Sequence, residues 1–509
     1  MMTARQTQVH TLCQLLAGIS DVDPRLDRAI AGLSLDSRTL QPGDAFFALR
    51  GQARCGEEFI DAAIARGAAA VFIEADEPAQ VQRGPVPLLA LPGLRAQVGA
   101  IASRFHDHPS VALAVLGVTG TNGKTSVTHL LAQALNHLSG SRACGVIGTI
   151  GCGFLDALDR SSVTTPDPVS LQGWFAKLRD AGARAAALEV SSHGLDQDRV
   201  AGTRFAAAAF TNLTRDHLDY HGDMAAYGAA KRKLFQTPGL GAAVVNLDDP
   251  FSFEIIADLA AAVRVRGYSR GGARFPAGML TPDVLGAVSS SGAGTGMIID
   301  CDAGRIAINS RLLGHFNAMN LLAAFSVLQA IGVPAADAAT ALSRAHGVPG
   351  RMEPFGGADG APRVVVDYAH TPDGLQAALK GCRAFTAGAL WCVFGCGGNR
   401  DVGKRPIMGA IAARLADRVV VTSDNPRDED PDAIIRQIQS GMPEPATALL
   451  QPDREAAIRQ CVVAPAPADL ILVAGKGHED YQEIEGVRRP FSDRAIVLAA
   501  LRERQGGRS

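Results

Sequence analysis

Apolar runs alternate with amphipathic segments along most of this chain. The apolar run at 111–120 ends in a glycine-rich turn, and residues 126–138 follow it with apolar side chains at the three- and four-residue spacing of a helix. Further strands are predicted at 184–190, 205–211 and 242–247, and a long helix at 315–332. Strands that alternate with helices favour a mostly parallel sheet with helices on both of its faces.

The segments on either side of this stretch also predict strands and helices. Residues 34–51 predict a strand, a Pro-Gly-Asp turn and a second strand, and residues 59–74 predict a helix, a glycine stop and a buried strand. Residues 104–110 are typical of a linker, and the Gly/Ser-rich residues 287–296 of a hairpin or a loop. After a cluster of glycine and proline at 346–353, four apolar strands each end in a polar loop rich in glycine or aspartate.

These boundaries predict an α/β protein of three domains. A small α/β domain occupies 1–110, a central domain with a mostly parallel sheet occupies 111–347, and a Rossmann-like α/β domain occupies 348–509. Ligands of open parallel sheets bind at the carboxyl ends of the strands. The loops that follow the strands of the last two domains are therefore the candidate sites.

The composition excludes several classes of protein. Of the 509 residues, 47% are hydrophobic and 20% are charged, which allows buried cores and excludes a disordered or fibrous chain. The 49 basic and 51 acidic residues give a net charge of −2, so no global charge attracts nucleic acid or a membrane surface. Nine scattered cysteines without a C-x-x-C pair favour free, mostly buried thiols in a reducing compartment. The N-terminus has no long apolar signal region and no apolar run has the length of a membrane span, so a cytoplasmic location is expected.

The segment GVTGTNGKTS lies between a predicted buried strand and a predicted helix, where a phosphate-binding loop belongs. Gly120 and Gly123 would let the backbone wrap a phosphate. Lys124 would reach the β- and γ-phosphates, and the Thr125 hydroxyl would hold Mg²⁺. Val118 stands where the strict pattern has a glycine. The segment specifies only ATP or GTP, and the alternative is a glycine turn with a surface lysine.

Two further strand ends carry a carboxylate and an imidazole. Glu189 and His193 follow one predicted strand, and Asp216 and His217 follow another. Neighbouring strand ends converge on the phosphate site, where such groups could hold Mg²⁺. His217 taken alone is more often a hydrogen-bonded loop histidine. Lys231 stands beside two more basic residues, and composition alone favours a solvated basic face there.

An ordered set of segments runs from the phosphate loop to the C-terminal domain. Together these segments resemble the Mur ligase family: GTNGKT (120–125), EVSSHGL (189–195), TNLTRDHLDYHG (211–222), AKRKLF (230–235), GRME (350–353), DYAHTPD (367–373), GCGGNRDVGKR (395–405), DNPR (424–427) and AGKGHE (474–479). The resemblance implies a ligase that activates the D-glutamate γ-carboxylate of UDP-MurNAc-L-Ala-D-Glu with ATP. The amine of a diamino acid then attacks the acyl phosphate, which gives an amide and phosphate in peptidoglycan precursor synthesis.

The resemblance also implies roles for named residues. Catalysis would rest on Lys124, Glu189, His217 and Lys231, with Lys231 carbamylated by CO₂ to N6-carboxylysine. Two Mg²⁺ ions would be held by Thr125, Glu189, His217 and the Lys231 carbamate, and would neutralise the transferring phosphoryl group. ATP would contact the loop residues Gly120, Thr121, Asn122, Gly123, Lys124, Thr125 and Ser126, and also Asn320, Arg351 and Asp367.

By the same resemblance, the remaining site residues bind the other two substrates. The UDP-MurNAc-dipeptide would contact Leu35, Ser37, Thr164, Thr165, Ser191, Gln197 and Arg199. Residues 51–54 and Val163 differ from the family pattern, which affects individual contacts there. meso-Diaminopimelate would contact Arg400, Asp424, Asn425, Pro426, Arg427, Gly475 and Glu479. Two guanidiniums can clamp its distal carboxylate, which L-lysine lacks, so the resemblance favours diaminopimelate.

Three alternatives remain at this level. Another amide ligase of the superfamily, such as folylpolyglutamate synthase, would share the phosphate loop but should lack the uridine domain and DNPR. A nucleotide-hydrolysing switch would leave the third domain's loops unexplained. A catalytically silent scaffold would not need the intact Lys124, Glu189, His217 and Lys231. No partner beyond the small-molecule substrates is expected, and neither are nucleic acid, a membrane span or a stable oligomer.

Overall fold

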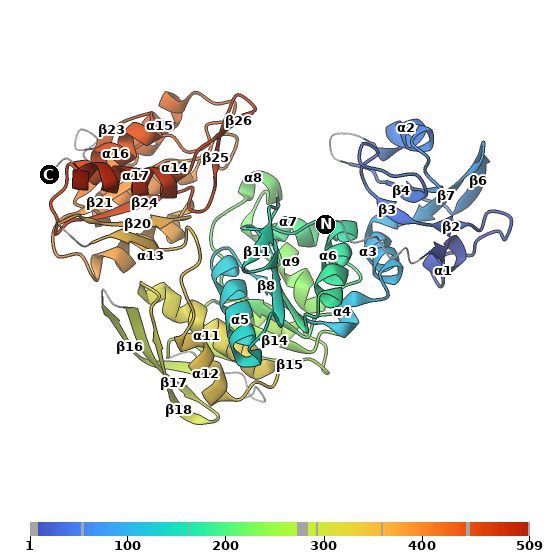
Figure 1. Cartoon of the computed structure of the whole chain (residues 1–509), viewed down its shortest axis with the longest axis horizontal. Helices are drawn as coiled ribbons and strands as arrows, with labels where there is room; N and C mark the ends of the chain where they lie inside the picture. Colours follow the sequence, from blue (N-terminus) through green and yellow to red (C-terminus); the bar gives the residue numbers. More distant parts are fainter. Residues whose placement is uncertain are drawn as a thin grey trace. The chain divides into compact units, whose positions relative to one another are not determined.

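The computed structural model describes residues 9–51, 55–161, 163–271, 283–291, 294–357, 360–443 and 448–506 (Figure 1). The family-specific contacts expected at 52–54 lie outside these residues. The chain divides into two compact units. One comprises residues 1–117, 141–208 and 233–241, and the other comprises 118–140, 209–232 and 242–509.

A five-stranded sheet near the N-terminus follows the predicted strands. Its order is β3-β4-β5-β7-β6, and all neighbours pair in parallel except β6 with β7. Phe46 and Phe47 are adjacent in a strand and therefore point to opposite faces. Phe46 packs with helix α2, whereas Phe47 packs with helices α1 and α3. The bounds are β3 (Gly32–Ser34), β4 (Asp44–Ala48), β5 (Ala70–Ala75), β6 (Ala79–Arg83), β7 (Val86–Pro92), α1 (Leu12–Leu16), α2 (Ile60–Ala65) and α3 (Leu94–Phe105), with β1 (His10–Thr11) and β2 (Ala29–Ile30) paired nearby.

The predicted linker at 104–110 is shorter than expected. Helix α3 ends at Phe105, and helix α4 (Pro109–Ala112) begins four residues later. Asp107 and His108 both have positive φ, which makes the connection a tight turn between two helices.

The large sheet is mixed: the pairs β9–β12, β14–β15 and β15–β16 are parallel, and the strands at both edges pair antiparallel. Its order is β11-β10-β9-β12-β8-β13-β14-β15-β16-β17-β18. Of the predicted hairpin or loop at 287–296, the described residues 287–291 and 294–296 belong to the antiparallel strands β16 and β17. The bounds are β8 (Ala114–Thr119), β9 (Cys144–Ile147), β10 (Cys152–Phe154), β11 (Ala157–Asp159), β12 (Ala185–Glu189), β13 (Ala207–Phe210), β14 (Ala242–Asn246), β15 (Arg264–Ser269), β16 (Asp283–Ser291), β17 (Gly294–Cys301) and β18 (Gly304–Ser310).

Helices accompany these strands as the sequence predicts. The predicted helix after the phosphate loop is α5 (Lys124–Ser139), and the predicted long helix is α11 (His315–Ala330). The other helices in these regions are α6 (Pro168–Asp180), α7 (Ser192–Asp196), α8 (Leu218–His221), α9 (Met224–Arg232), α10 (Phe251–Ala257) and α12 (Ala335–Ser343), with short 3₁₀ turns at Gly56–Phe59 and Lys233–Gln236.

The C-terminal sheet confirms the four predicted strands. Its order is β19-β20-β24-β21-β22-β23, and β20, β24, β21 and β22 pair in parallel. Their bounds are β19 (Glu353–Gly356), β20 (Arg363–Asp367), β21 (Leu390–Phe394), β22 (Arg418–Val421), β23 (Leu449–Leu450) and β24 (Leu470–Ala474), and a separate hairpin joins β25 (Tyr481–Ile484) to β26 (Val487–Pro490).

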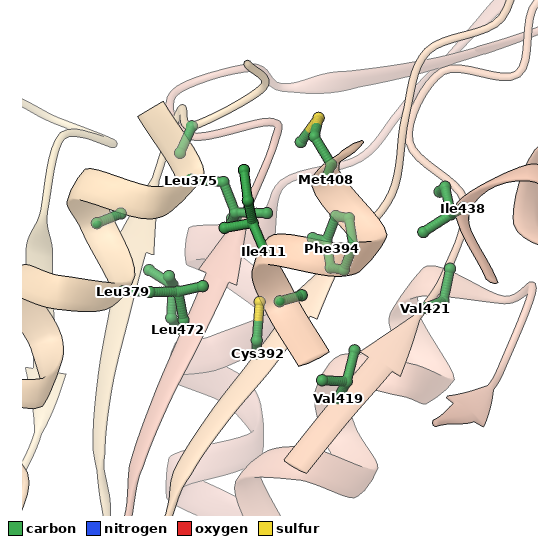
Figure 2. Close-up of a cluster of buried hydrophobic side chains, with 14 of the residues drawn as sticks. Leu375, Leu379, Cys392, Phe394, Met408, Ile411, Val419, Val421, Ile438 and Leu472 are labelled. Carbon is green, nitrogen blue, oxygen red and sulfur yellow. The ribbon is translucent and has the colours of Figure 1, made fainter. Parts of the chain in front are cut away.

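Helices cover both faces of this C-terminal sheet. Figure 2 shows one face, where Leu375 and Leu379 of α13 and Ile411 of α14 pack with strand residues such as Phe394 and Leu472. Helices α16 and α17 pack on the other face. The bounds are α13 (Pro372–Arg383), α14 (Lys404–Leu415), α15 (Pro431–Gln439), α16 (Arg454–Val463) and α17 (Asp493–Gly506). The α/β class with helices on both faces is therefore confirmed.

All nine cysteines have free thiols and most of them are buried, as predicted. Within the described residues, no helix is both long and apolar enough to cross a membrane.

A buried ion pair ties two helices to the strand ends of the C-terminal sheet. Arg454 donates two hydrogen bonds to Asp493, at 2.8 and 2.7 Å, and both side chains are 0% exposed. Arg454 also donates to the carbonyl oxygens of Ser423 and Ala474, which lie beside the DNPR and GKGHE segments. This pair therefore holds both loops in place.

We expect Asp493→Ala to lower the free energy of unfolding of this region by about 3–5 kcal/mol, because it leaves a buried guanidinium uncompensated. Hydrogen exchange of peptides covering 418–424 and 470–475 measures this change. Glu503→Ala is the matched control, since the exposed Glu503 joins the same two helices through the half-exposed Arg459. Glu503→Ala should lower the free energy of unfolding by less than about 1 kcal/mol. Equal protection in the two variants would contradict the assignment.

Candidate functional site

The phosphate loop joins β8 to α5 in a backbone conformation that requires glycine. Gly120 has φ 147° and Gly123 has φ 89°. A Cβ on Gly120 would lie 1.9 Å from the Thr211 hydroxyl oxygen, so only glycine fits. Thr211 in turn donates to the Asn122 carbonyl at 2.6 Å, and the Asn212 side chain accepts from the Asn122 N–H at 2.9 Å. Thr211 and Asn212, which follow β13, therefore fix the conformation of the phosphate loop.

Lys124 and Thr125 begin helix α5 directly after this loop. Lys124 Nζ donates to the carbonyl oxygens of Gly120 and Thr121, at 2.8 and 2.9 Å. Thr125 is buried, and its hydroxyl accepts a hydrogen bond from Arg351 Nη2 at 3.0 Å. Ser126 is also buried on the same turn. The lysine therefore folds over the loop at the place where phosphate oxygens would lie.

We expect Gly120→Ala to weaken binding of Mg-ATP by about tenfold or more, because forced positive φ costs about 1–3 kcal/mol and the new Cβ meets Thr211. Calorimetric titration of the purified protein with Mg-ATP measures the dissociation constant. Gly140→Ala is the matched control, since Gly140 has φ 62° but no atom lies within 4 Å of its added Cβ. This control should cost only about 1 kcal/mol of stability and leave nucleotide affinity intact. Unchanged affinity in Gly120→Ala would show that the loop does not bind nucleotide.

The side chain of Lys231 is buried. The prediction of a solvated basic face, which composition alone favours, is therefore wrong at this position. Its side chain lies on α9 and is 1% exposed, whereas Lys233 is exposed. Lys231 Nζ donates to the Gly120 carbonyl at 2.9 Å and lies 4.3 Å from the centre of the Tyr227 ring. Burial and the positive charge of Lys124 hold the pKa of Lys231 well below its usual value, although Asp216 opposes them. The amine is therefore prone to be neutral.

Asp216 gathers basic side chains from separate segments. Its carboxylate lies 3.4 Å from His217 Nε2, 3.6 Å from His370 Nε2 and 3.9 Å from Lys404 Nζ. Burial alone would raise the pKa of Asp216, but the hydrogen bond from His370 and the neighbouring positive charges hold it well below the usual value. His217 has φ 55°, and its backbone N–H donates to Asp216. His370 and Lys404 were missed in the sequence, although both stand inside the family segments.

Two of the three further residues expected to contact ATP, Asn320 and Arg351, adjoin the start of α5. Asn320 is buried, and its Oδ1 would lie 2.7 Å from a Cβ on Gly123. The Arg351 guanidinium stacks 4.3 Å above the Tyr368 ring while it donates to Thr125. Asp367 accepts from the Met352 N–H at 2.7 Å, and burial raises its pKa although Arg351 opposes the shift.

Glu189 is the last residue of β12 and is described within the other compact unit. Its Oε1 accepts from the Thr149 N–H at 2.9 Å, and its Oε2 accepts from the Thr149 hydroxyl at 3.1 Å. A Cβ on Gly148 would lie 2.1 Å from Glu189 Oε1, so this carboxylate needs the neighbouring glycine. Thr149 was missed in the sequence, where only the flanking glycines mark it. His193 lies on α7 next to this segment.

Most of the residues expected to grip the muramoyl-dipeptide share one hydrogen-bond network with Glu189. The Thr165 hydroxyl donates to the Glu189 carbonyl at 2.9 Å and lies 3.1 Å from Ser191 Oγ. Arg199 donates to the Thr165 carbonyl and to Gln197, both at 2.7 Å. The Thr164 hydroxyl oxygen lies 3.1 Å from the Thr149 hydroxyl oxygen. Leu35 and Ser37 lie apart from this network, in the loop after β3.

The DNPR and GKGHE segments meet at the carboxyl edge of the C-terminal sheet. Asn425 Nδ2 donates to Glu479 Oε2 at 2.9 Å. Gly475 has φ 118°, and a Cβ there would lie 2.9 Å from Asp424 Oδ2. Lys476, which the sequence analysis did not single out, is buried between them and donates to Glu479 Oε2 at 3.0 Å.

The two arginines expected to clamp a carboxylate lie against one glycine. A Cβ on Gly397 would be 3.0 Å from Arg427 Nη1 and 3.7 Å from Arg400 Cγ. Arg427 has φ 50° and donates to the Gly398 carbonyl at 2.6 Å, while the Arg400 side chain lies 3.7 Å from Asp219. Pro426 packs its carbonyl against Gly398. The structure thus brings the expected diaminopimelate residues to neighbouring loops.

The phosphate loop lies at the carboxyl end of a mostly parallel sheet, and the C-terminal sheet adds a second α/β layer. This arrangement defines the class of α/β proteins that bind a nucleotide. Three family models match the chain: "Mur ligase family, catalytic domain" at 29–106, "Mur ligase middle domain" at 118–328 and "Mur ligase, glutamate ligase domain" at 350–477.

Known proteins match over nearly the whole length. A UDP-N-acetylmuramoyl-L-alanyl-D-glutamate--2,6-diaminopimelate ligase of Xanthomonas campestris pv. campestris is 48% identical, and the match covers 98% of this chain and 99% of that protein. The Pseudomonas aeruginosa protein of the same name is also 48% identical, over 92% of this chain and 94% of its own. A solved structure with that name is 35% identical, with a TM-score of 0.69 over 98% of this chain and 99% of its own. The chain belongs to the Mur ligase family.

Proposed function

We propose that this chain is an ATP-dependent ligase that adds meso-2,6-diaminopimelate to the D-glutamate γ-carboxylate of UDP-MurNAc-L-Ala-D-Glu. The carboxylate takes the γ-phosphoryl group of ATP and releases ADP. The amine of diaminopimelate then attacks the acyl phosphate, loses a proton and displaces phosphate to leave an amide. The observation that carries this proposal is the 48% identity, over nearly the full length, to ligases named for this substrate.

The phosphate loop would position the nucleotide for the first step. Its glycine backbone offers N–H groups to the phosphates, and Lys124 would exchange its two loop carbonyls for phosphate oxygens. Thr125, Glu189, His217 and a carbamate on Lys231 would hold Mg²⁺, whose charge would neutralise the transferring phosphoryl group. Asn320, Arg351 and Asp367 would border the adenine side.

Carbamylation of Lys231 has a physical basis in its surroundings. CO₂ adds to a neutral amine, and the lowered pKa of Lys231 favours that form. The resulting carbamate would be an anion beside Lys124, where an ammonium would be repelled. Lys231 would thereby change from a buried cation into an oxygen ligand.

The C-terminal loops would select the amine. Arg400 and Arg427 would bind the distal carboxylate of diaminopimelate through parallel hydrogen bonds, and Glu479 with the Gly475 carbonyl would receive its distal ammonium. L-lysine lacks the distal carboxylate, so both guanidiniums would be left without that partner.

The three domains would divide the substrates between them. Residues 1–110 would hold the uridine nucleotide, residues 111–347 would bind ATP, and residues 348–509 would bind the amino acid. The nine free thiols support a reducing cytoplasm as the location, and a monomer is proposed as the working state.

Phosphate release tests this function directly. With ATP, Mg²⁺ and UDP-MurNAc-L-Ala-D-Glu, release is expected to depend on meso-diaminopimelate and to be much slower with L-lysine. Equal rates with both amines would retain the ligase and overturn the arginine clamp. Release without any amine would favour a nucleotide-hydrolysing switch.

A further inference from the structure

Lys476 is a fully buried lysine at the edge of the proposed amine site. Its side chain is 0% exposed in the loop after β24. Its Nζ donates to Asn425 Oδ1 at 2.8 Å and to Glu479 Oε2 at 3.0 Å, and lies 3.6 Å from Asp424 Oδ1. A buried ammonium needs such acceptors, since its charge is costly to remove from water.

These contacts fix the orientation of the Asn425 amide. Its Oδ1 accepts from Lys476 Nζ and from the Glu483 N–H at 3.0 Å, and both partners are donors only. The Asn425 amino group must therefore face Glu479, where Nδ2 donates to Oε2 at 2.9 Å. Glu479 Oε2 thus receives two donors, one from Asn425 and one from Lys476.

The other oxygen of Glu479 is bound less closely than Oε2. Among the described residues, Oε1 receives one hydrogen bond, from the Tyr368 hydroxyl at a long 3.4 Å. The Glu479 side chain keeps 15% exposure beside a lysine that keeps none. The positive charge of Lys476 balances one of the two negative charges of Asp424 and Glu479. One net negative charge is left on this group of three side chains.

We propose that Lys476 is a positioning residue that sets the specificity for an amine carrying a second ammonium group. Together with Asn425 it holds Oε2, so that Oε1 and the single remaining negative charge meet one distal ammonium. Lys476 itself touches no substrate group in this arrangement. The inference rests on the proposed function, because it assigns the distal ammonium of the diamino acid to Glu479.

A pair of substrates separates this role from a structural one. L-2-Aminopimelate keeps the reacting amine and the distal carboxylate of meso-diaminopimelate but lacks the distal ammonium. The wild-type protein is expected to prefer meso-diaminopimelate in kcat/KM, measured by phosphate release. In Lys476→Met this preference is expected to fall by about tenfold or more, the range of a hydrogen bond to a charged group. A merely structural lysine would lower both kcat/KM values equally, and an unchanged ratio would overturn the proposal.

Two further variants complete the test. Lys380→Met, at the exposed end of α13 in the same sheet region, should leave the ratio unchanged. If circular dichroism shows that Lys476→Met is unfolded, Lys476→Arg replaces it, since Arg keeps the charge but its larger fork displaces Glu479, and the same ratio decides. A wild-type protein that uses neither amine would overturn the proposed function, whereas a wild-type preference that the variant retains overturns the positioning role alone.

Discussion

Replacement of Lys231 by alanine is expected to lower kcat for phosphate release by about a thousandfold, the upper range for removing one group that stabilises transition-state charge. Lys231 is buried, shares the Gly120 carbonyl with Lys124 and has a pKa held well below its usual value. Alanine removes the amine that would carry CO₂ and so removes an oxygen ligand for Mg²⁺. Phosphate release under saturating substrates measures the loss.

The cause of that loss can be separated from general damage. Lys233→Ala is the matched control, because Lys233 follows on the same segment but is exposed and paired with Asp196. It should retain wild-type activity. Wild-type protein dialysed against CO₂-free buffer should lose activity and regain it with bicarbonate, and its intact mass should change by one CO₂. A Lys231→Ala variant within tenfold of wild type would refute the role.

Replacement of Arg427 by alanine is expected to reduce the preference for meso-diaminopimelate over L-lysine by about a hundredfold in kcat/KM. Arg427 lies at the Gly397–Gly398 turn, in a positive-φ conformation that the loop holds against strain. Loss of its guanidinium removes a bidentate partner for the distal carboxylate. L-lysine has no such group, so its own kcat/KM should change little.

Two companion variants sharpen this test. Arg427→Lys keeps the charge but not the planar fork, so it should fall between wild type and alanine. Arg436→Ala is the matched control, since Arg436 is exposed on α15 and pairs with Asp430. That variant should keep the full preference. If Arg427→Ala also keeps it, the distal carboxylate is bound elsewhere.

The phosphate loop and the strand–helix alternation could be predicted from the sequence because they are local. The glycines at 120 and 123 are required by backbone conformations that other residues avoid, and the helical spacing after them marks α5. The four C-terminal strands were predicted for the same reason, since each apolar run and its polar loop adjoin in the chain. The length of the linker predicted at 104–110 was overestimated, because charged residues and proline also occur in a tight turn between helices.

What surrounds a side chain depends on segments that pack together from distant parts of the chain. Periodicity along α9 cannot show that Lys231 reaches the Gly120 carbonyl, so its basic neighbours suggested a solvated face. Thr149 meets Glu189 across 40 residues, and Lys476 meets Asn425 across 51. The sequence by itself determined the α/β class, the loop and the family. Only the tertiary structure decided which lysines are buried and which oxygen of Glu479 receives two donors, because burial and hydrogen-bond partners are set by packing between elements.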